Sequence, residues 1–120
     1  MIEHMTHEAY VLSCRQRAVD LATGILDGTM NVLEACRDLA ALHWEVEVDQ
    51  WDEDFTRFSG ISSETDALPV GRVRDLWSAA ALARIEPDIQ SAVEWATPLA
   101  IPACRSVIAR FHRPADSFPE

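Results

Sequence analysis

The chain lacks lysine altogether, and all ten of its basic residues are arginines. A Schiff base forms on an amine nucleophile. Without lysine, only the N-terminal amino group could be that nucleophile. Against the ten arginines stand 20 acidic residues, which give a formal net charge of -10. Binding to a nucleic acid duplex depends on clustered basic side chains that neutralise phosphates. The charge balance therefore disfavours nucleic acid as a partner and favours a cationic partner or none.

Long apolar runs are also missing from the sequence. Arginine, glutamate or proline interrupts every apolar stretch well short of the roughly 20 residues that a bilayer requires, so we expect no membrane span. Residues 1–8 lack the basic and apolar regions of a secretory signal, which favours a cytoplasmic location. A chain of 120 residues that is 48% hydrophobic and 25% charged is typical of one globular domain with one core.

Cysteine is scarce, with three residues and no Cys-x-x-Cys pair. An odd number without that spacing argues against a disulfide framework or a zinc knuckle. Cys14, Cys36 and Cys104 each fall among apolar neighbours in a segment with helical periodicity. A reduced cysteine in such a place behaves as a small hydrophobic residue, so we expect all three in the core.

The hydrophobic periodicity predicts an all-α, single-domain helical bundle. Apolar residues recur at three- and four-residue spacing over 6–27, where Thr6 is placed as N-cap and Gly28 as the C-terminal stop. Asn31, followed by an acid three residues later, has the capping-box pattern and begins a second helix over 31–46. Two helices joined by so short a turn are expected to form an N-terminal antiparallel helical hairpin.

The end of the second helix has two interpretations. Residues 44–49 alternate between apolar and acidic side chains, which fits a β-strand, whereas Val46 also continues the helical face. An isolated strand would leave its backbone donors and acceptors without partners. We therefore expect helix to about Val46.

Glycines and prolines divide the rest of the chain. Asp52 is placed to cap a short helix that Gly60 ends, a long central loop is expected over 60–71, and Ser78 is placed as the N-cap of a later helix. Proline is disfavoured inside a helix, so we expect helix breaks at Pro87, Pro98 and Pro102. The resulting helices are predicted at 52–59, 78–85, 87–97 and 102–112, with a frayed tail at 113–120.

Residues 60–71 read Gly-Ile-Ser-Ser-Glu-Thr-Asp-Ala-Leu-Pro-Val-Gly, with Asp54-Phe55 upstream and Ala103-Cys104-Arg105 downstream. With these segments, and with Arg74 and Trp77, the chain resembles a group of small acidic bacterial proteins of unknown function that carry a Gly-Ile-x-Ser-Glu-Thr-Asp-x-Leu-Pro-x-Gly segment. The resemblance spans most of the chain and implies no activity. The chain departs from that group's pattern at its three prolines between residues 87 and 102, where the group has a more continuous helix.

Residues 44–66 hold eight acids and a single base, Arg57. Tryptophan is enriched at interface hot spots and carboxylates steer cationic partners, so this stretch indicates a contact surface. The candidate partner-binding residues are Trp44, Asp49, Trp51, Asp52, Glu53, Asp54, Glu64 and Asp66. The alternative is structural: the tryptophans pack against Phe55 and Phe58, and Glu64 or Asp66 pairs with Arg72 or Arg74.

Signatures of catalysis are missing from the same stretch. A calcium loop that began at Asp52 would need glycine where Arg57 stands and glutamate where Ser63 stands. The histidines are scattered, and the four glycines are too dispersed to cradle a phosphate. We therefore predict no catalytic residue, no metal site and no cofactor.

The leading hypothesis is a non-enzymatic cytoplasmic interaction protein. In its sharpest form it is an immunity or antitoxin-like inhibitor that presents an acidic, tryptophan-bearing surface to a basic protein partner. Two alternatives stay open. One is a small metal-dependent hydrolase that uses Glu64 and Asp66, and the other is a structural homo-oligomer assembled through Trp77, Trp95 and helical faces.

Overall fold

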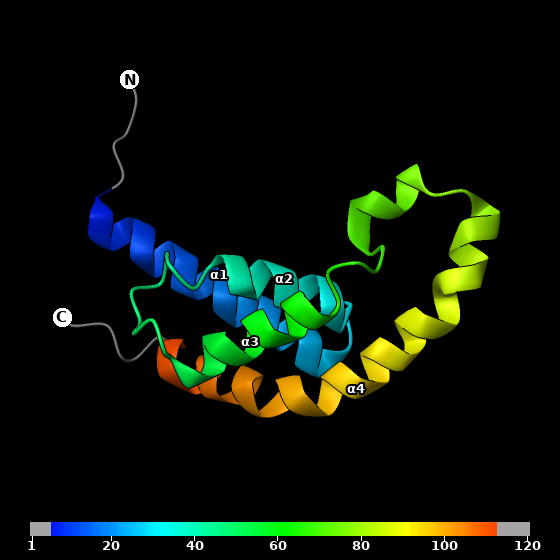
Figure 1. Cartoon of the computed structure of the whole chain (residues 1–120). Helices are drawn as coiled ribbons and strands as arrows, with labels where there is room; N and C mark the ends of the chain where they lie inside the picture. The colour runs from blue at the N-terminus through cyan, green and yellow to red at the C-terminus, as the bar shows by residue number, and fades with distance from the viewer. Residues whose placement is uncertain (1–5, 113–120) are drawn as a thin grey trace, which may run out of the picture.

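Helices form every regular element of the computed structural model, which describes residues 6–112 (Figure 1). The α-helices are α1 (His7–Asp27), α2 (Val32–Ala41), α3 (Glu53–Glu64) and α4 (Ala79–Phe111), and a 3-10 helix, η1 (Gly71–Leu76), precedes α4. No strand occurs in residues 6–112, so the predicted all-α class is confirmed and the strand interpretation of 44–49 is wrong. None of these helices is both long enough and apolar enough to cross a membrane.

A side chain caps the start of each α-helix, and the four capping residues are the ones that the sequence indicates. Their oxygens accept backbone N–H groups at Thr6 (from Ala9), Asn31 (from Leu33 and Glu34), Asp52 (from Phe55) and Ser78 (from Ala81). Gly28 ends α1 in the left-handed conformation, with φ of 79°. Each cap contributes about 1 kcal/mol, so local sequence fixes where the helices begin.

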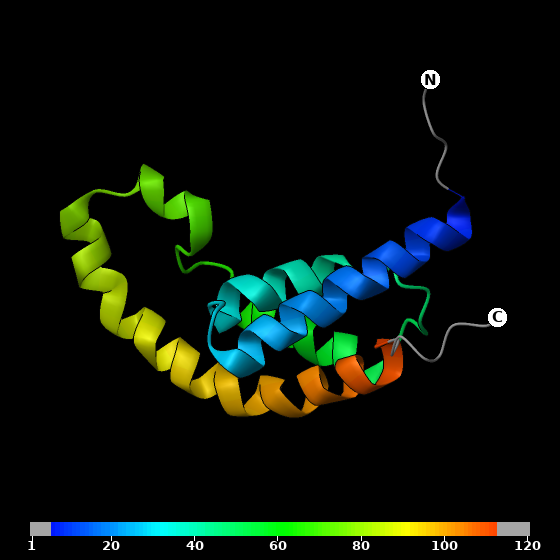
Figure 2. The ribbon, with the colours of Figure 1, turned by 180° about the vertical axis from the view of Figure 1, so that it is seen from behind.

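The core lies where α1, α2, α3 and the second half of α4 pack together (Figures 1 and 2). Its largest fully buried side chains include Leu33, Leu39, Phe55, Phe58 and Ile61. The rings of Phe55 and Phe58 meet edge to face, 5.6 Å apart. All three cysteines are buried, as predicted, and burial raises the pKa of Cys36 and Cys104 to about 12, so both thiols stay neutral.

The second helix ends earlier than predicted. α2 stops at Ala41 rather than near Val46, and residues 42–47 follow as successive turns. Val46 is fully buried all the same, and its carbonyl accepts a hydrogen bond of 2.8 Å from Arg15 Nε on α1. Since a tertiary bond satisfies that carbonyl, the segment does not need a continuing helix.

The third helix ends later than predicted. Gly60 does not stop α3, which continues to Glu64 and buries Ile61 in the core. The Thr65 hydroxyl then donates to the Ile61 carbonyl at 2.8 Å and closes the last turn. The predicted loop over 60–71 is therefore wrong in its first half, and the irregular stretch is 65–70.

The largest correction concerns the helices predicted at 78–85, 87–97 and 102–112, because α4 is one continuous helix. Pro87, Pro98 and Pro102 are all exposed, and their spacings of 11 and 4 residues are close to whole turns, so they share one face. The carbonyls that lose a partner belong to Ala83, Glu94 and Pro98, which are exposed too. Water can therefore satisfy these carbonyls, and proline bends the helix instead of ending it.

The bend wraps α4 around the other helices and carries its first half away from them (Figure 1). Ile89 is the first buried residue of α4. The arm, defined as residues 71–88, consists of η1 and the turns of α4 before Ile89. Arg74 of η1 pairs with Glu86 of α4 at 3.3 Å, which links the two parts of the arm. The predicted tail at 113–120 lies outside the described residues.

Phe55→Ala tests the core. The substitution should lower the free energy of unfolding by about 3–5 kcal/mol, because the lost ring leaves a cavity beside Phe58. Urea unfolding followed by circular dichroism measures the change. Leu76→Ala, at a residue that is 84% exposed, is the control and should change stability by less than about 0.5 kcal/mol. Equal effects at both positions would contradict this placement of the core.

Candidate functional site

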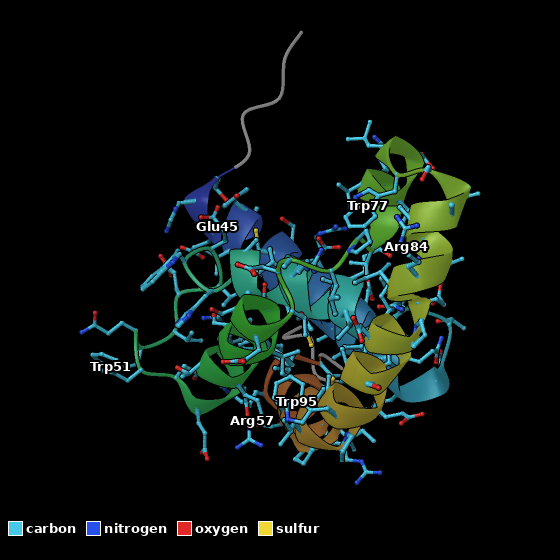
Figure 3. All side chains as sticks on the ribbon, turned by 45° about the vertical axis from the view of Figure 1, so that its right-hand side comes forward. Glu45, Trp51, Arg57, Trp77, Arg84 and Trp95 are labelled. Atoms are coloured by element: carbon cyan, nitrogen blue, oxygen red, sulfur yellow. The ribbon has the colours of Figure 1, made fainter. Side chains whose placement is uncertain are left out.

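Two exposed tryptophans lie on the segment between α2 and α3. Trp44 is 69% exposed and Trp51 is 78% exposed, and Figure 3 shows Trp51 projecting away from the helices. They border a hollow of about 330 Å³, which we call the tryptophan hollow; its remaining lining is His43, Gln50, Thr56 and Ser59. The alternative in which these tryptophans are partly buried against Phe55 and Phe58 is therefore wrong.

His43 holds Trp44 in place. The two rings stack at 4.6 Å with only 3° between their planes, and His43 is itself buried. Its Nε2 lies 3.1 Å from the carbonyl oxygen of Asp49. A carbonyl only accepts, so this ring nitrogen donates. One buried imidazole thus fixes both Trp44 and the backbone at the far side of the hollow.

The start of α1 holds the same segment from the other side. Tyr10 donates a hydrogen bond to the carboxylate of Glu45, and this bond raises the pKa of Tyr10. His7 Nε2 lies 2.5 Å from a carboxylate oxygen of Glu47. Arg15 also reaches the Glu47 carbonyl at 3.4 Å. Glu45 and Glu47 therefore have partners within the chain.

Asp52 and Asp54 turn inward and bind Arg110 near the end of α4. Arg110 donates to Asp52 at 2.7 Å and to Asp54 at 2.8 Å, and Ser106 donates to Asp54 at 2.5 Å. The two carboxylate side chains are only 10% and 13% exposed. Burial alone would raise the pKa of Asp52, but hydrogen bonds from Arg110 and from the Phe55 N–H outweigh it, so the pKa is lowered. The hydrogen bonds from Arg110 to Asp52 and Asp54 raise the pKa of Arg110.

The free carboxylates beside the tryptophans are fewer than the sequence indicated. Asp49 and Glu53 are exposed, and Asp49 also accepts the backbone N–H of Trp51 at 2.6 Å. Of the predicted surface residues between Trp44 and Asp54, Trp44, Asp49, Trp51 and Glu53 are therefore the exposed ones.

Glu64 and Asp66 lie at the opposite end of α3. Glu64 is the last residue of the helix, 11 residues beyond Glu53, or about 17 Å along its axis. Both acids are exposed, and no ion pair found in residues 6–112 involves either of them. The predicted pairing with Arg72 or Arg74 is therefore wrong, since Arg74 pairs with Glu86 instead.

Sequence reasoning missed three arginines that position these segments. Arg15 binds the turn after α2, Arg110 binds the start of α3, and Arg37 donates to the carbonyls of Thr65 and Leu68, at 2.9 Å for Leu68. Each arginine lies next to apolar positions on its helix, a pattern that by itself indicates only a solvated edge. Their targets lie 28 to 58 residues away, so no local spacing reveals them.

Comparison with known protein families, curated proteins and solved structures finds no match to this chain. In the part of the chain that the structure describes, no three side chains of histidine, cysteine, aspartate or glutamate gather closely enough to hold a metal ion. The tryptophan hollow, together with the exposed Asp49 and Glu53 on either side of Trp51 in the sequence, therefore forms the candidate site.

Arg110→Gln tests whether Asp52 and Asp54 are structural. At neutral pH the variant should lose about 1–3 kcal/mol of unfolding free energy, because two partly buried carboxylates lose their charged partner. The lowered pKa of Asp52 means that its contribution is complete above its ordinary pKa of about 3.9 and fades as the pH falls further. The stability difference between wild type and variant should therefore shrink below about pH 4.

Urea unfolding at a series of pH values measures that difference. Arg57→Gln is the matched control, because Arg57 is exposed on α3 and takes part in none of the ion pairs described for residues 6–112. A difference that stays constant across the acid range would sink the argument that Arg110 acts on these carboxylates.

Proposed function

We propose that this chain is a non-enzymatic interaction protein that binds a basic protein partner at the tryptophan hollow. The observation that carries the proposal is the exposure of Trp44 and Trp51, at 69% and 78%, on a segment tied to α1. Exposing two indoles to water is unfavourable unless another surface covers them. Rigid aromatic rings of this kind are the usual anchors of protein interfaces.

The order of the segment supports binding without rearrangement. His43 stacks on the ring of Trp44, and Asp49 accepts the backbone N–H of Trp51, so the Trp44 ring and the Trp51 backbone are held before any partner arrives. A preorganised surface loses little conformational entropy on association. The hollow between the rings can therefore receive a side chain of the partner at low cost.

Charge supports a basic partner. The chain carries a net charge of -10, and Asp49 and Glu53, two residues before and after Trp51, are exposed. Glu64 and Asp66 add exposed carboxylates at the other end of α3, so a basic surface lying along this helix would meet acids at both ends. Such complementarity mainly raises the association rate and makes it sensitive to salt.

The sharpest form of this function is an immunity or antitoxin-like inhibitor of a basic protein. A small acidic protein with a preorganised aromatic patch suits a partner that must be bound fast and held by a few buried contacts. In this form the tryptophans provide the anchor, whereas the carboxylates steer the encounter.

The test begins with capture of partners from a lysate of the source cells at low salt. Wild type and Trp44→Ser/Trp51→Ser serve as baits, and a basic protein retained only by wild type is then purified. With that protein, calorimetry should show at least a tenfold loss of affinity for the double variant, because two anchors are gone. Leu76→Ser, an equally exposed apolar site on the arm, should bind like wild type.

The role of charge is tested by association kinetics with the same partner. Asp49→Asn/Glu53→Gln should slow association and flatten its dependence on salt, with little change in dissociation. Asp75→Asn/Glu94→Gln removes the same charge from exposed positions elsewhere and is the matched control. Equal kinetics for the two variants, or equal capture by wild type and the tryptophan variant, would contradict the proposed site.

A further inference from the structure

A line of mostly exposed side chains runs along one side of the arm and continues on α4. Ala81, Arg84, Asp88, Ser91 and Trp95 follow one another at alternating spacings of three and four residues, and all but the half-buried Ala81 are exposed. The five residues therefore share one face of the helix. Trp95 is 45% exposed, and Trp77, which directly precedes the N-cap of α4, is 37% exposed. In Figure 3, Trp77 lies beside η1 just before α4 begins, and Arg84 and Trp95 follow on successive parts of α4. We call these six residues the α4 stripe.

The α4 stripe has a symmetric order. Arg84 and Asp88 stand two residues before and after Glu86, Ala81 and Ser91 stand five before and after it, and Trp77 and Trp95 stand nine before and after it. Read in either direction the stripe is therefore aromatic, small, charged, charged, small and aromatic. Arg84 and Asp88 carry opposite charges. When two stripes run in opposite directions, Arg84 of one therefore lies opposite Asp88 of the other.

We infer that the α4 stripe is a homodimer interface in which two copies of α4 pair in antiparallel orientation around a two-fold axis beside Glu86. In this pairing Arg84 of each copy meets Asp88 of the other, and Trp77 of each meets Trp95 of the other. Contacts of this reciprocal kind define an isologous interface. The inference does not rest on the proposed function.

Charge complementarity identifies the occupant as a second copy. A partner must present an acid opposite Arg84 and a base opposite Asp88 at the same separation, and this chain's own stripe does so. Both side chains are exposed, and no ion pair described for residues 6–112 includes either of them. Glu86 at the axis lies on the opposite side of the helix and is paired with Arg74, so the two copies do not bring like charges together there.

The second copy's Trp77 can pack into the hollows beside Trp95. A hollow of about 290 Å³ lies beside Trp95 toward the arm, lined by Leu68 and Ala92 among others, and a second of about 350 Å³ lies on its far side next to Leu99. Each hollow offers apolar side chains that an indole can cover, and Glu64 also lines both of them. Covering them would remove Trp95 from water, which supplies most of the stabilisation.

The length of the contact sets its strength. From Ala79, the first residue of α4, to Trp95 the paired helix extends about 24 Å, and one helix pair of that length falls at the small end of specific interfaces. The dimer is therefore weak and depends on concentration. Its specificity comes from the two Arg84–Asp88 crossings, because a parallel or shifted pairing loses both.

Charge reversal tests this arrangement in the full-length chain. In Arg84→Asp, or in Asp88→Arg, both crossings change from attraction to repulsion, so the dimer should weaken by about thirtyfold. The double variant Arg84→Asp/Asp88→Arg restores both crossings and should dimerise like wild type. Sedimentation velocity over a series of concentrations measures each dissociation constant. Arg105→Asp, on α4 but outside the stripe, is the matched control and should leave dimerisation unchanged.

Mixing the two single variants is the decisive experiment. An equimolar mixture of Arg84→Asp and Asp88→Arg pairs aspartate with arginine at both crossings of the heterodimer, so it should form dimers although neither variant does so alone. Misfolded variants could not recover in this way. Wild type that stays monomeric at every concentration, or a mixture that fails to associate, would overturn the inference.

Discussion

The contact between Arg110 and the two carboxylates at the start of α3 is the interaction on which the rest of the structure depends. It joins residues 58 positions apart and fixes the end of α4 against the cap of α3. Asp52 caps its helix with one oxygen while both of its oxygens bind the guanidinium. If this contact opened, the start of α3 would no longer be held and Phe55 would lose its position in the core. The segment that carries Trp51 would then be fixed only at its α2 end.

The same contact reduces the number of acidic side chains that the protein presents to solvent. The acid-rich stretch suggests a continuous negative surface, but Asp52 and Asp54 are both paired with Arg110, and Glu45 and Glu47 bind side chains of α1. The acids that remain in solvent lie at the two ends of α3. Part of the negative charge therefore stabilises the fold through contacts within the chain. A partner would meet separate acidic points instead of a uniform negative field.

Local signals in the sequence were enough to predict the helical class, the four N-caps and the burial of the cysteines, because these depend on a few neighbouring residues. The failures have a different origin. Proline bends a helix without ending it where water can reach the freed carbonyl, and the exposed face shared by Pro87 and Pro98 leaves their freed carbonyls open to water. The turns after α2 depend on Arg15, which binds the carbonyl of Val46, 31 residues later, and no helical periodicity encodes that contact.

The two proposed surfaces lie on different parts of the molecule. Figure 3 places Trp51 at one edge, with Trp77 and Arg84 on the arm at the other. Pairing through the α4 stripe would therefore leave both tryptophan hollows of the dimer open to solvent. A partner with two basic sites could then bind both hollows, and the second contact would benefit from a high effective concentration without any new interaction. A partner with a single site would gain nothing from dimerisation. The weak dimer would thus select for repeated or multimeric partners.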